Sequence, residues 1–410
     1  MSSRAPFTSY QKRLFVFLSV ANFFEGYDFF AITQLLPSLR ESFGMSLREE
    51  MWLVTLINFG TILAFLLVRR ADRWGRKRVL SVTIAGYALF TFLSALAPNA
   101  VVFGALQMVA RIFLIGEWAT SMVVAAEEYP AERRGTVIGV VSAAAGLGSI
   151  VCAGVVPLLL KTPLGWRSVY LVGVIPLVLM MFARRGLRET KRFTETAPGD
   201  GAPPLWDVLR GPHRRRVLQL GAIWFLSYVC TNNAVTFFKD FAMEERNLSH
   251  GQVGQIMTVA ALVSMPLVFL AGRMLDGIGR KRGAAVIYAA TILGVFGSYT
   301  LSGVLPLMLC MTIGIFGINA VLTVLNTFMT ELFPTDVRGS AVALSNNLLG
   351  RIGYVFSPLL LGELVGELGL GTPLRVSVVF PLIALGLIFL WLPETNRREL
   401  EETAELVQAR

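Results

Sequence analysis

Residues 14–39 read LFVFLSVANFFEGYDFFAITQLLPSL, an apolar run with two carboxylates, Glu25 and Asp28, near its middle. A helix needs about 20 apolar residues, at a rise of about 1.5 Å each, to cross a bilayer, and this run is long enough. Glu25 and Asp28 are three positions apart, so they share one face of the predicted helix. An ionised carboxylate at mid-bilayer depth costs at least about 2.5 kcal/mol. We therefore expect that face to line a water-filled cavity or to meet a partner helix, either at a functional site or as a structural pair that locks two helices.

The composition is typical of an integral membrane protein. Of the 410 residues, 54% are hydrophobic and 16% are charged, and the mean hydropathy is positive, unlike that of a soluble domain of this length. The first apolar run is too long for a signal-peptide core and is followed by no small-residue cleavage site. We expect it to remain as the first span.

Apolar segments of spanning length recur along the whole chain. They cover residues 14–39, 51–69, 79–97, 101–126, 136–160, 168–183, 216–241, 252–272, 284–304, 306–331, 340–365 and 373–392. We predict an all-α membrane protein of twelve transmembrane helices in two six-helix bundles. The bundles are expected at 1–183 and 216–392, with a cytoplasmic linker at 184–215 and a cytoplasmic tail at 393–410.

Two motifs repeat at one offset, which supports the division into halves. DRWGRKR at 72–78 returns as DGIGRKR at 276–282, 204 residues later. The second motif, Glu-x-x-Pro-x-x-x-Arg-Gly, begins at Glu127 and returns at Glu331, again 204 residues later. Two independent motifs with one offset indicate a duplicated six-helix unit. A third pair, Glu189-Thr190 and Glu394-Thr395, closes each half at an offset of 205 (189 to 394).

The distribution of Lys and Arg predicts the orientation. When the amino terminus is placed inside, most Lys and Arg residues fall on the cytoplasmic side. We therefore expect a protein of the cell (inner) membrane with both termini in the cytoplasm. The net charge of +10 is spread over short loops beside the spans. We therefore expect these charges to fix the orientation of the helices in the membrane, and we do not expect nucleic acid as a partner.

Few side chains remain for chemistry inside the membrane. The three cysteines, Cys152, Cys230 and Cys310, lie in apolar segments, so we expect no disulfide and no metal site. His213 and His250 lie in hydrophilic connections, which leaves carboxylates to carry protons within the spans. No Gly-rich phosphate loop follows a strand. We expect no cofactor, no ATP-driven transport and no enzyme activity.

The doubled Asp-x-x-Gly-Arg-Lys loop, after the second and eighth predicted spans, resembles that of the major facilitator superfamily of secondary transporters. The resemblance implies two halves that alternate access to a central site. It also implies that charged residues of the loops hold the cytoplasmic side closed. The alternative is that these charges only set the orientation of the helices in the membrane. These gating candidates are Asp72, Arg76, Glu127, Arg134, Asp276, Arg280, Glu331 and Arg338. The family's glycine four residues before the aspartate is present as Gly272 but is Val68 in the first copy.

Several spans resemble particular branches of the superfamily. Asn22, Glu25, Asp28 and Phe29 are similar to the first span of metabolite–proton symporters. GEW at 116–118 resembles those and the sialate and lactate carriers, and GRIG at 350–353 with Pro358 resembles the aromatic acid–proton symporters. Sugar porters share GYD at 26–28 and PET at 393–395, but Asn232 and Asn233 replace their paired glutamines. The Gly-Pro pair typical of drug–proton antiporters is absent from the fifth span.

The proton-coupling candidates are four charged residues of the first and fourth spans. Counted from the cytoplasmic ends of their helices, Asp28 and Arg111 lie at one depth. An arginine beside Asp28 would keep it ionised, and loss of the arginine would let it take a proton; the alternative is a permanent ion pair bracing two helices. Glu117 lies near the level of Glu25, and one of these two acids is expected to hold a proton. The alternative for Glu117 is a permanently neutral acid bonded to a neighbouring helix.

Arg351 is the expected substrate anchor, because it is the one basic residue in the middle of the second half's predicted spans and a guanidinium binds a carboxylate through two hydrogen bonds. The alternative is a structural contact to a backbone carbonyl. Asn232 is the repeat equivalent of Asp28, 204 residues later. The other substrate-binding candidates are polar or aromatic residues of the spans, namely Tyr27, Trp118, Asn232, Asn233, Asn319, Asn347 and Tyr354.

We therefore predict a monomeric secondary transporter that carries a small organic anion with protons by alternating access. A sugar or polyol porter, an efflux carrier for organic cations and a non-transporting receptor remain alternatives. The sugar porter would use the motifs shared with that branch, and the efflux carrier would bind its cation at Glu25, Asp28 and Glu117. The sequence does not name the substrate.

Overall fold

The computed structural model describes residues 7–129, 131–172, 205–333 and 335–396, and in these ranges the regular structure is helical, with no strand. Each of the twelve predicted spans contains or begins with a helix, the sixth being represented by α6 alone. The later part of the sixth span, the linker up to residue 204, the pair Glu189-Thr190 and the tail from 397 lie outside the described residues.

The chain divides into two compact units. Unit 1 comprises Met1–Leu35 and Leu56–Asp200, and unit 2 comprises Leu36–Thr55 and Gly201–Arg410. The last turns of the first helix and the first turns of the second therefore belong to unit 2, together with the second half of the sequence.

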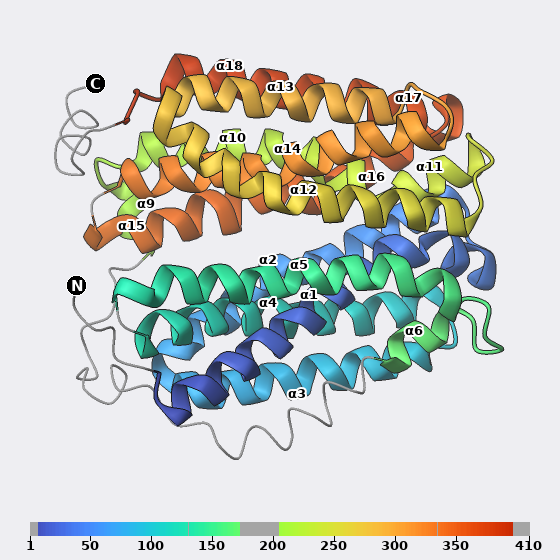
Figure 1. The fold of residues 1–410 in the computed structure, drawn as a ribbon, viewed down its shortest axis with the longest axis horizontal. Helices are drawn as coiled ribbons and strands as arrows, with labels where there is room; N and C mark the ends of the chain where they lie inside the picture. Colours follow the sequence, from blue (N-terminus) through green and yellow to red (C-terminus); the bar gives the residue numbers. More distant parts are fainter. Residues whose placement is uncertain (1–6, 130, 173–204, 334, 397–410) are drawn as a thin grey trace. The chain divides into compact units, whose positions relative to one another are not determined.

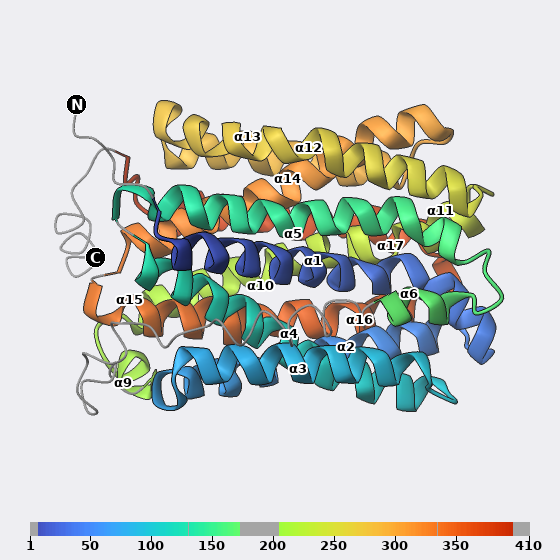
Figure 2. The same ribbon diagram turned by 60° about the horizontal axis from the view of Figure 1, so that its bottom comes forward.

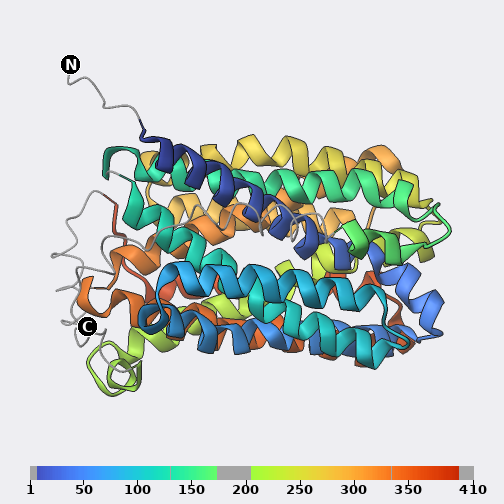
Figure 3. The ribbon, with the colours of Figure 1, turned by 90° about the horizontal axis from the view of Figure 1, so that it is seen from below.

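Figure 1 shows the helices of the first half, which are long except for α6. They are α1 (Ser9–Phe43), α2 (Leu47–Trp74), α3 (Arg76–Ala95), α4 (Ala100–Glu128), α5 (Ala131–Leu159) and α6 (Trp166–Val172). The Asn99 side chain caps α4 by accepting a hydrogen bond from the Val102 backbone N–H, at 2.9 Å. Figure 3 shows α3, in light blue, beside α4, with which it packs along much of its length. Leu18, Ala125 and Val141 lie in a buried apolar cluster shared by α1, α4 and α5.

Two glycines bring α1 against α5. A Cβ on Gly26 would lie 1.9 Å from the Ala145 carbonyl oxygen, and one on Gly148 would lie 1.8 Å from that of Phe23. The Ser149 hydroxyl, one residue on, donates a hydrogen bond of 2.9 Å to the Gly26 carbonyl. Glycine at these positions is therefore required for contact between the two backbones, and this contact sets the depth and rotation of Glu25 and Asp28.

The second half repeats this plan with shorter pieces. Its elements are α9 (Leu205–Arg210), α10 (Arg214–Thr236), α11 (Phe238–Glu244), α12 (His250–Ile278), α13 (Arg280–Ser298), α14 (Val304–Glu331), α15 (Thr335–Val342), η2 (Ala343–Gly350), α16 (Arg351–Leu368), α17 (Gly371–Val376) and α18 (Val379–Trp391). Figure 2 shows α12, α13 and α14 as one group in unit 2, in agreement with their mutual packing. Gly294 and Gly314 allow α13 and α14 to approach closely, since a Cβ on Gly294 would lie 2.3 Å from the Gly314 nitrogen.

One segment departs from α-helical geometry. Residues Ala343–Gly350 form a π-helix, η2, which continues directly into α16 at Arg351. A π-helix is wider than an α-helix, rotates the residues that follow it, and is often found at functional sites. The rotation decides where the Arg351 side chain points.

Among the described residues, eight helices are long and apolar enough to cross a membrane. Large apolar side chains on their outer faces are exposed, as with Leu293 at 68% and Leu390 at 77%. Such faces suit contact with lipid, because lipid tails do not penalise exposed apolar surface.

Candidate functional site

An acidic cluster lies in unit 1, where α1, α3 and α4 meet. Asp28 is only 8% exposed, and its Oδ2 accepts a hydrogen bond of 3.3 Å from the Thr91 hydroxyl of α3. Arg111 of α4 is 4% exposed and is close enough for its charge to act on Asp28. The structure thus brings the two predicted partners into one buried site.

Arg111 does not form an ion pair with Asp28 in this conformation. No carboxylate of the described residues lies within 4 Å of its guanidinium, whose Cζ instead lies 4.4 Å from the centroid of the Phe29 ring. Its Nη1 is buried without a hydrogen-bond partner. The guanidinium is therefore held by an aromatic face while its hydrogen-bonding capacity remains unused, and the proposed switch stays a prediction.

Glu25 and Glu117 are the other buried acids of unit 1. Glu117 Oε1 accepts a hydrogen bond of 2.5 Å from Ser121, one turn along α4, and Glu25 Oε2 is buried without a partner. The charges of Glu117 and Arg111 both act on Glu25. The like-charged neighbours that the sequence predicts therefore do lie near each other, and they share their environment with Arg111.

The aromatic candidates of unit 1 differ in exposure. Tyr27 is 4% exposed, and its buried hydroxyl has no hydrogen-bond partner in the described structure, whereas Trp118 is 43% exposed. Sequence reasoning missed Thr91, although α3 carries a signal for it. Thr83, Tyr87, Thr91 and Ser94 are buried polar residues at helical spacing on one face of an apolar helix.

A cationic cluster lies in unit 2 and is built around Arg351. The Arg351 Cζ lies 5.0 Å from the centroid of the Tyr354 ring and 5.5 Å from that of Tyr228. The two rings pack edge to face at 5.5 Å, and the Tyr228 hydroxyl donates to Asn346 Oδ1 at 3.0 Å. No carboxylate of the described residues pairs with Arg351. Two aromatic faces hold the guanidinium and leave its N–H groups available.

Glycines again allow the approach that forms this site. A Cβ on Gly350 would lie 2.6 Å from the Trp224 Cβ, and one on Gly353 would lie 2.5 Å from the Phe225 carbonyl oxygen. Both contacts join α10 to the segment around Arg351. Tyr228 and Trp224, at 5.1 Å between ring centroids, form the α10 side of the site.

The predicted asparagines contribute unequally. Asn232 Nδ2 donates to the Tyr354 carbonyl at 3.1 Å and so ties α10 to α16. Asn233 and Asn319 donate to carbonyls of their own helices, at 3.1 and 2.9 Å, and Asn347 lies on η2. Of this group, Asn232 is directly joined to the aromatic site.

The gating candidates form equivalent ion pairs in the two halves. Arg76 pairs with Glu127 at 3.1 Å, and Arg280 pairs with Glu331 at 2.7 Å, at the offset of 204 (76 to 280). Arg280 also pairs with Asp276 at 2.8 Å. The remaining gating candidates, whose side chains lie outside what the structure describes, are Asp72, Arg134 and Arg338.

Glu394 completes the network in unit 2. It accepts hydrogen bonds from the backbone N–H groups of Arg280 and Lys281, at 2.8 and 3.0 Å, and so caps α13, whose N-cap Gly279 has no side chain. Partial burial raises the pKa of Glu394, but the backbone hydrogen bonds outweigh it and the pKa is lowered. Thr395 donates to Glu331 at 2.5 Å.

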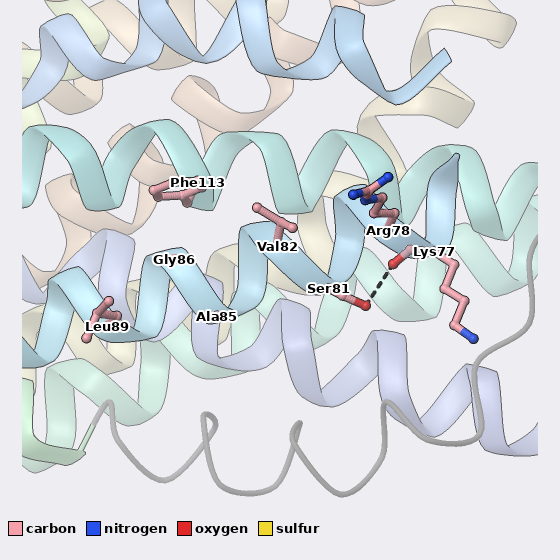
Figure 4. A pocket seen from close by; sticks show the side chains of 8 residues that line it. All are labelled: Lys77, Arg78, Ser81, Val82, Ala85, Gly86, Leu89 and Phe113. Carbon is pink, nitrogen blue, oxygen red and sulfur yellow. Dashed lines mark hydrogen bonds between the residues drawn. The ribbon is translucent and has the colours of Figure 1, made fainter. Parts of the chain in front are cut away.

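A groove of about 560 Å³ lies over α3 and α4 but does not coincide with the acidic or the cationic cluster (Figure 4). Lys77 and Arg78 lie at one end of it, and the rest is lined by Ser81 and apolar residues. None of the predicted site residues lines it.

The sequence model described as "Major Facilitator Superfamily" matches residues 18–358 and 225–409. These matches cover most of the chain. The chain belongs to the major facilitator superfamily. The predicted family is therefore confirmed, and the chain is a membrane transporter and not an enzyme.

Similar proteins carry organic acids according to their names. The sialic acid transporter NanX of Escherichia coli (strain K12) is 24% identical over 379 residues, which cover 89% of this chain and 90% of the relative. The cis,cis-muconate transport protein of Acinetobacter baylyi is 26% identical over 382 residues, covering 88% and 89%.

A solved structure supports the fold. The xylose transporter XylE from E. coli, in an inward open conformation, matches with a TM-score of 0.79 and 16% identity over 96% of this chain and 98% of that one. Together with the family, this confirms the predicted all-α membrane fold of twelve helices in two pseudo-symmetric bundles.

Proposed function

We propose that this member of the superfamily is a proton-coupled symporter of a small organic carboxylate. The observation that carries the proposal is Arg351, a guanidinium that contacts the rings of Tyr228 and Tyr354 and has no carboxylate partner among the described residues. A charged residue within a membrane helix is costly and is usually paired. A substrate carboxylate would supply the missing partner through two parallel hydrogen bonds.

The rings favour a particular kind of substrate. Two tyrosines stabilise the guanidinium by cation–π contact, and Trp224 extends the aromatic surface from Tyr228. A planar or apolar body attached to the carboxylate would pack on such a surface. This supports an organic anion over a sugar, whose hydroxyl groups would need a denser set of hydrogen-bonding side chains.

The buried acids of unit 1 supply the proton sites. Asp28, Glu25 and Glu117 are buried, and Arg111 acts on Asp28 and Glu25 without pairing with either. Movement of one guanidinium over a short distance would change which acid is held ionised. The relatives that carry sialic acid and cis,cis-muconate, both organic acids, agree with an anionic substrate.

The protein is proposed to work as a monomer in the inner membrane, with both termini in the cytoplasm. The experiment that tests the function is uptake into proteoliposomes driven by an inward proton gradient, with aromatic and aliphatic carboxylates, sugars and amines as substrates. Gradient-dependent accumulation of a carboxylate supports the proposal. Accumulation of sugars alone, or gradient-driven export of amines, contradicts it and favours one of the alternative carriers.

A further inference from the structure

A second cluster of buried charge lies far along the helices from Asp28, where the end of α1 and the start of α2 meet α11 in unit 2 (Figure 1). Arg40 is at its centre and forms ion pairs with three carboxylates. Its Nη1 lies 3.5 Å from Glu50 Oε2, and its Nη2 lies 3.6 Å from Asp240 Oδ1 and also contacts Glu244.

The two inner carboxylates are poorly satisfied. The side chains of Glu50 and Asp240 are 0% exposed, and none of their four oxygens accepts a hydrogen bond from another described residue. Arg40 is too far from both for a normal hydrogen bond. A buried carboxylate without hydrogen bonds is strongly destabilised when ionised.

The cluster carries more negative than positive charge. Arg40 pairs with Glu50, Asp240 and Glu244, and Lys239, which is 1% exposed, acts on Asp240. One carboxylate is in excess. Two acids that share one site in this way retain a proton between them, because they cannot both ionise at low cost.

Other charged groups near the cluster do not pair with Glu50 or Asp240. Arg48 forms an exposed ion pair with Glu363 of α16, at 2.7 Å, and Glu245 accepts hydrogen bonds from the backbone N–H groups that lead into α17. His250 of α12 is acted on by Lys239 and Glu41. None of these supplies the missing positive charge to Glu50 and Asp240.

We propose that Glu50 and Asp240 bind one proton between them and that this proton holds residues 36–55 against α11. The proposal goes beyond the proposed function, since it assigns a proton site separate from Asp28 and does not depend on the substrate. Residues 36–55 belong to unit 2 although the rest of α1 and α2 belongs to unit 1. Loss of the proton would leave two buried charges without hydrogen bonds and break this contact.

The direction of the pH dependence follows from the cluster. Burial raises the pKa of Glu50 well above its ordinary value of 4.5, Asp240 raises it further, and Arg40 lowers it. When the cluster separates and Glu50 meets water, its pKa returns towards the ordinary value. The assembled cluster is therefore favoured at low pH, and this support is lost as the pH rises through the pKa of the assembled state.

The test measures exposure of Met51, which is buried beside Glu50 and packs against Gly362 of α16. A cysteine at Met51, in the full chain in nanodiscs without substrate, is labelled with a maleimide between pH 5 and 8. The labelling rate of Ser42→Cys, at an exposed position, corrects for the pH dependence of thiol reactivity. The unaltered protein gives the background labelling of its native cysteines. The corrected labelling rate is expected to rise by up to tenfold per pH unit.

Glu50→Gln and Asp240→Asn, each made in the Met51→Cys protein, should each remove this slope, since the amide imitates the protonated acid. Glu363→Gln, which alters an exposed ion pair of the same region, should keep it. A slope that persists in both acid variants overturns the proposal, as does a parent protein without a slope. If one acid variant does not fold, the other decides. Loss of the slope in Asp28→Asn would place the proton at Asp28 and also overturn the proposal, whereas failure of carboxylate transport would leave it unaffected.

Discussion

Replacement of Arg351 by lysine tests the proposed anchor most directly. The guanidinium can donate two charge-assisted hydrogen bonds to a carboxylate in one fixed geometry, whereas an ammonium acts as a point charge. Loss of one such bond costs about 1.5 to 3 kcal/mol. The two ring contacts, at 5.0 and 5.5 Å, hold a planar guanidinium better than an ammonium and add to the loss.

At about 1.4 kcal/mol for each tenfold change in affinity, Arg351→Lys should raise the Kd of a bound carboxylate by roughly 10-fold to 100-fold. The assay is a ligand-induced rise in melting temperature of the purified protein, measured at several ligand concentrations. The charge is retained, so the fold should survive.

Arg246→Lys is the matched control, since Arg246 also lies over an aromatic ring of unit 2, that of Phe241, at 4.7 Å. It should leave the Kd unchanged. If Arg351→Lys binds the carboxylate as tightly as the control does, Arg351 is not the anchor and the proposed substrate class loses its main support.

Three further predictions concern other parts of the molecule. Asp28→Asn imitates the protonated acid, so it should abolish accumulation driven by a pH gradient in proteoliposomes but leave substrate exchange measurable; uphill accumulation by this variant would transfer the coupling role to another acid. Gly26→Ala would place a methyl group 1.9 Å from the Ala145 carbonyl oxygen and should destabilise the protein by about 1 to 3 kcal/mol or more, while Gly139→Ala, with open space at its Cβ, should change the melting temperature little; equal effects would argue against the backbone contact. Because the pKa of Glu394 is lowered from 4.5 in the folded protein, its stabilisation is present above about pH 4.5 and is lost as the pH falls below that value, so Glu394→Gln should lower the melting temperature at pH 7 but converge with the parent at low pH. A constant difference at all pH values would exclude this titration.

The sequence by itself determined the class of the protein and the plan of its fold. Apolar runs of spanning length mark membrane helices because a bilayer requires each backbone polar group to be satisfied within its own helix. The offset of 204 between two motifs marked the halves, and the family match agrees with both inferences. At these motifs the structure shows equivalent ion pairs in the two halves, Arg76 with Glu127 and Arg280 with Glu331.

Only the tertiary structure decided which side chains meet. Counting residues placed Asp28 and Arg111 at one depth, but the count could not show that the guanidinium rests on Phe29 or that Thr91 donates to Asp28. Depth follows from the rise per residue along one helix. Partners depend on rotation about the helix axis, and rotation is set by contacts with other helices, such as that of Gly26 with α5.

The same reason applies to Arg351 and Arg40. The sequence marked Arg351 as an isolated base, but its position beside two tyrosines depends on the π-helix that precedes it and rotates it. Glu50 and Asp240 lie 190 residues apart in the chain (50 to 240). No local pattern links such positions. They meet because the end of α1 and the start of α2 pack with the second half of the sequence. That packing is a property of the folded backbone.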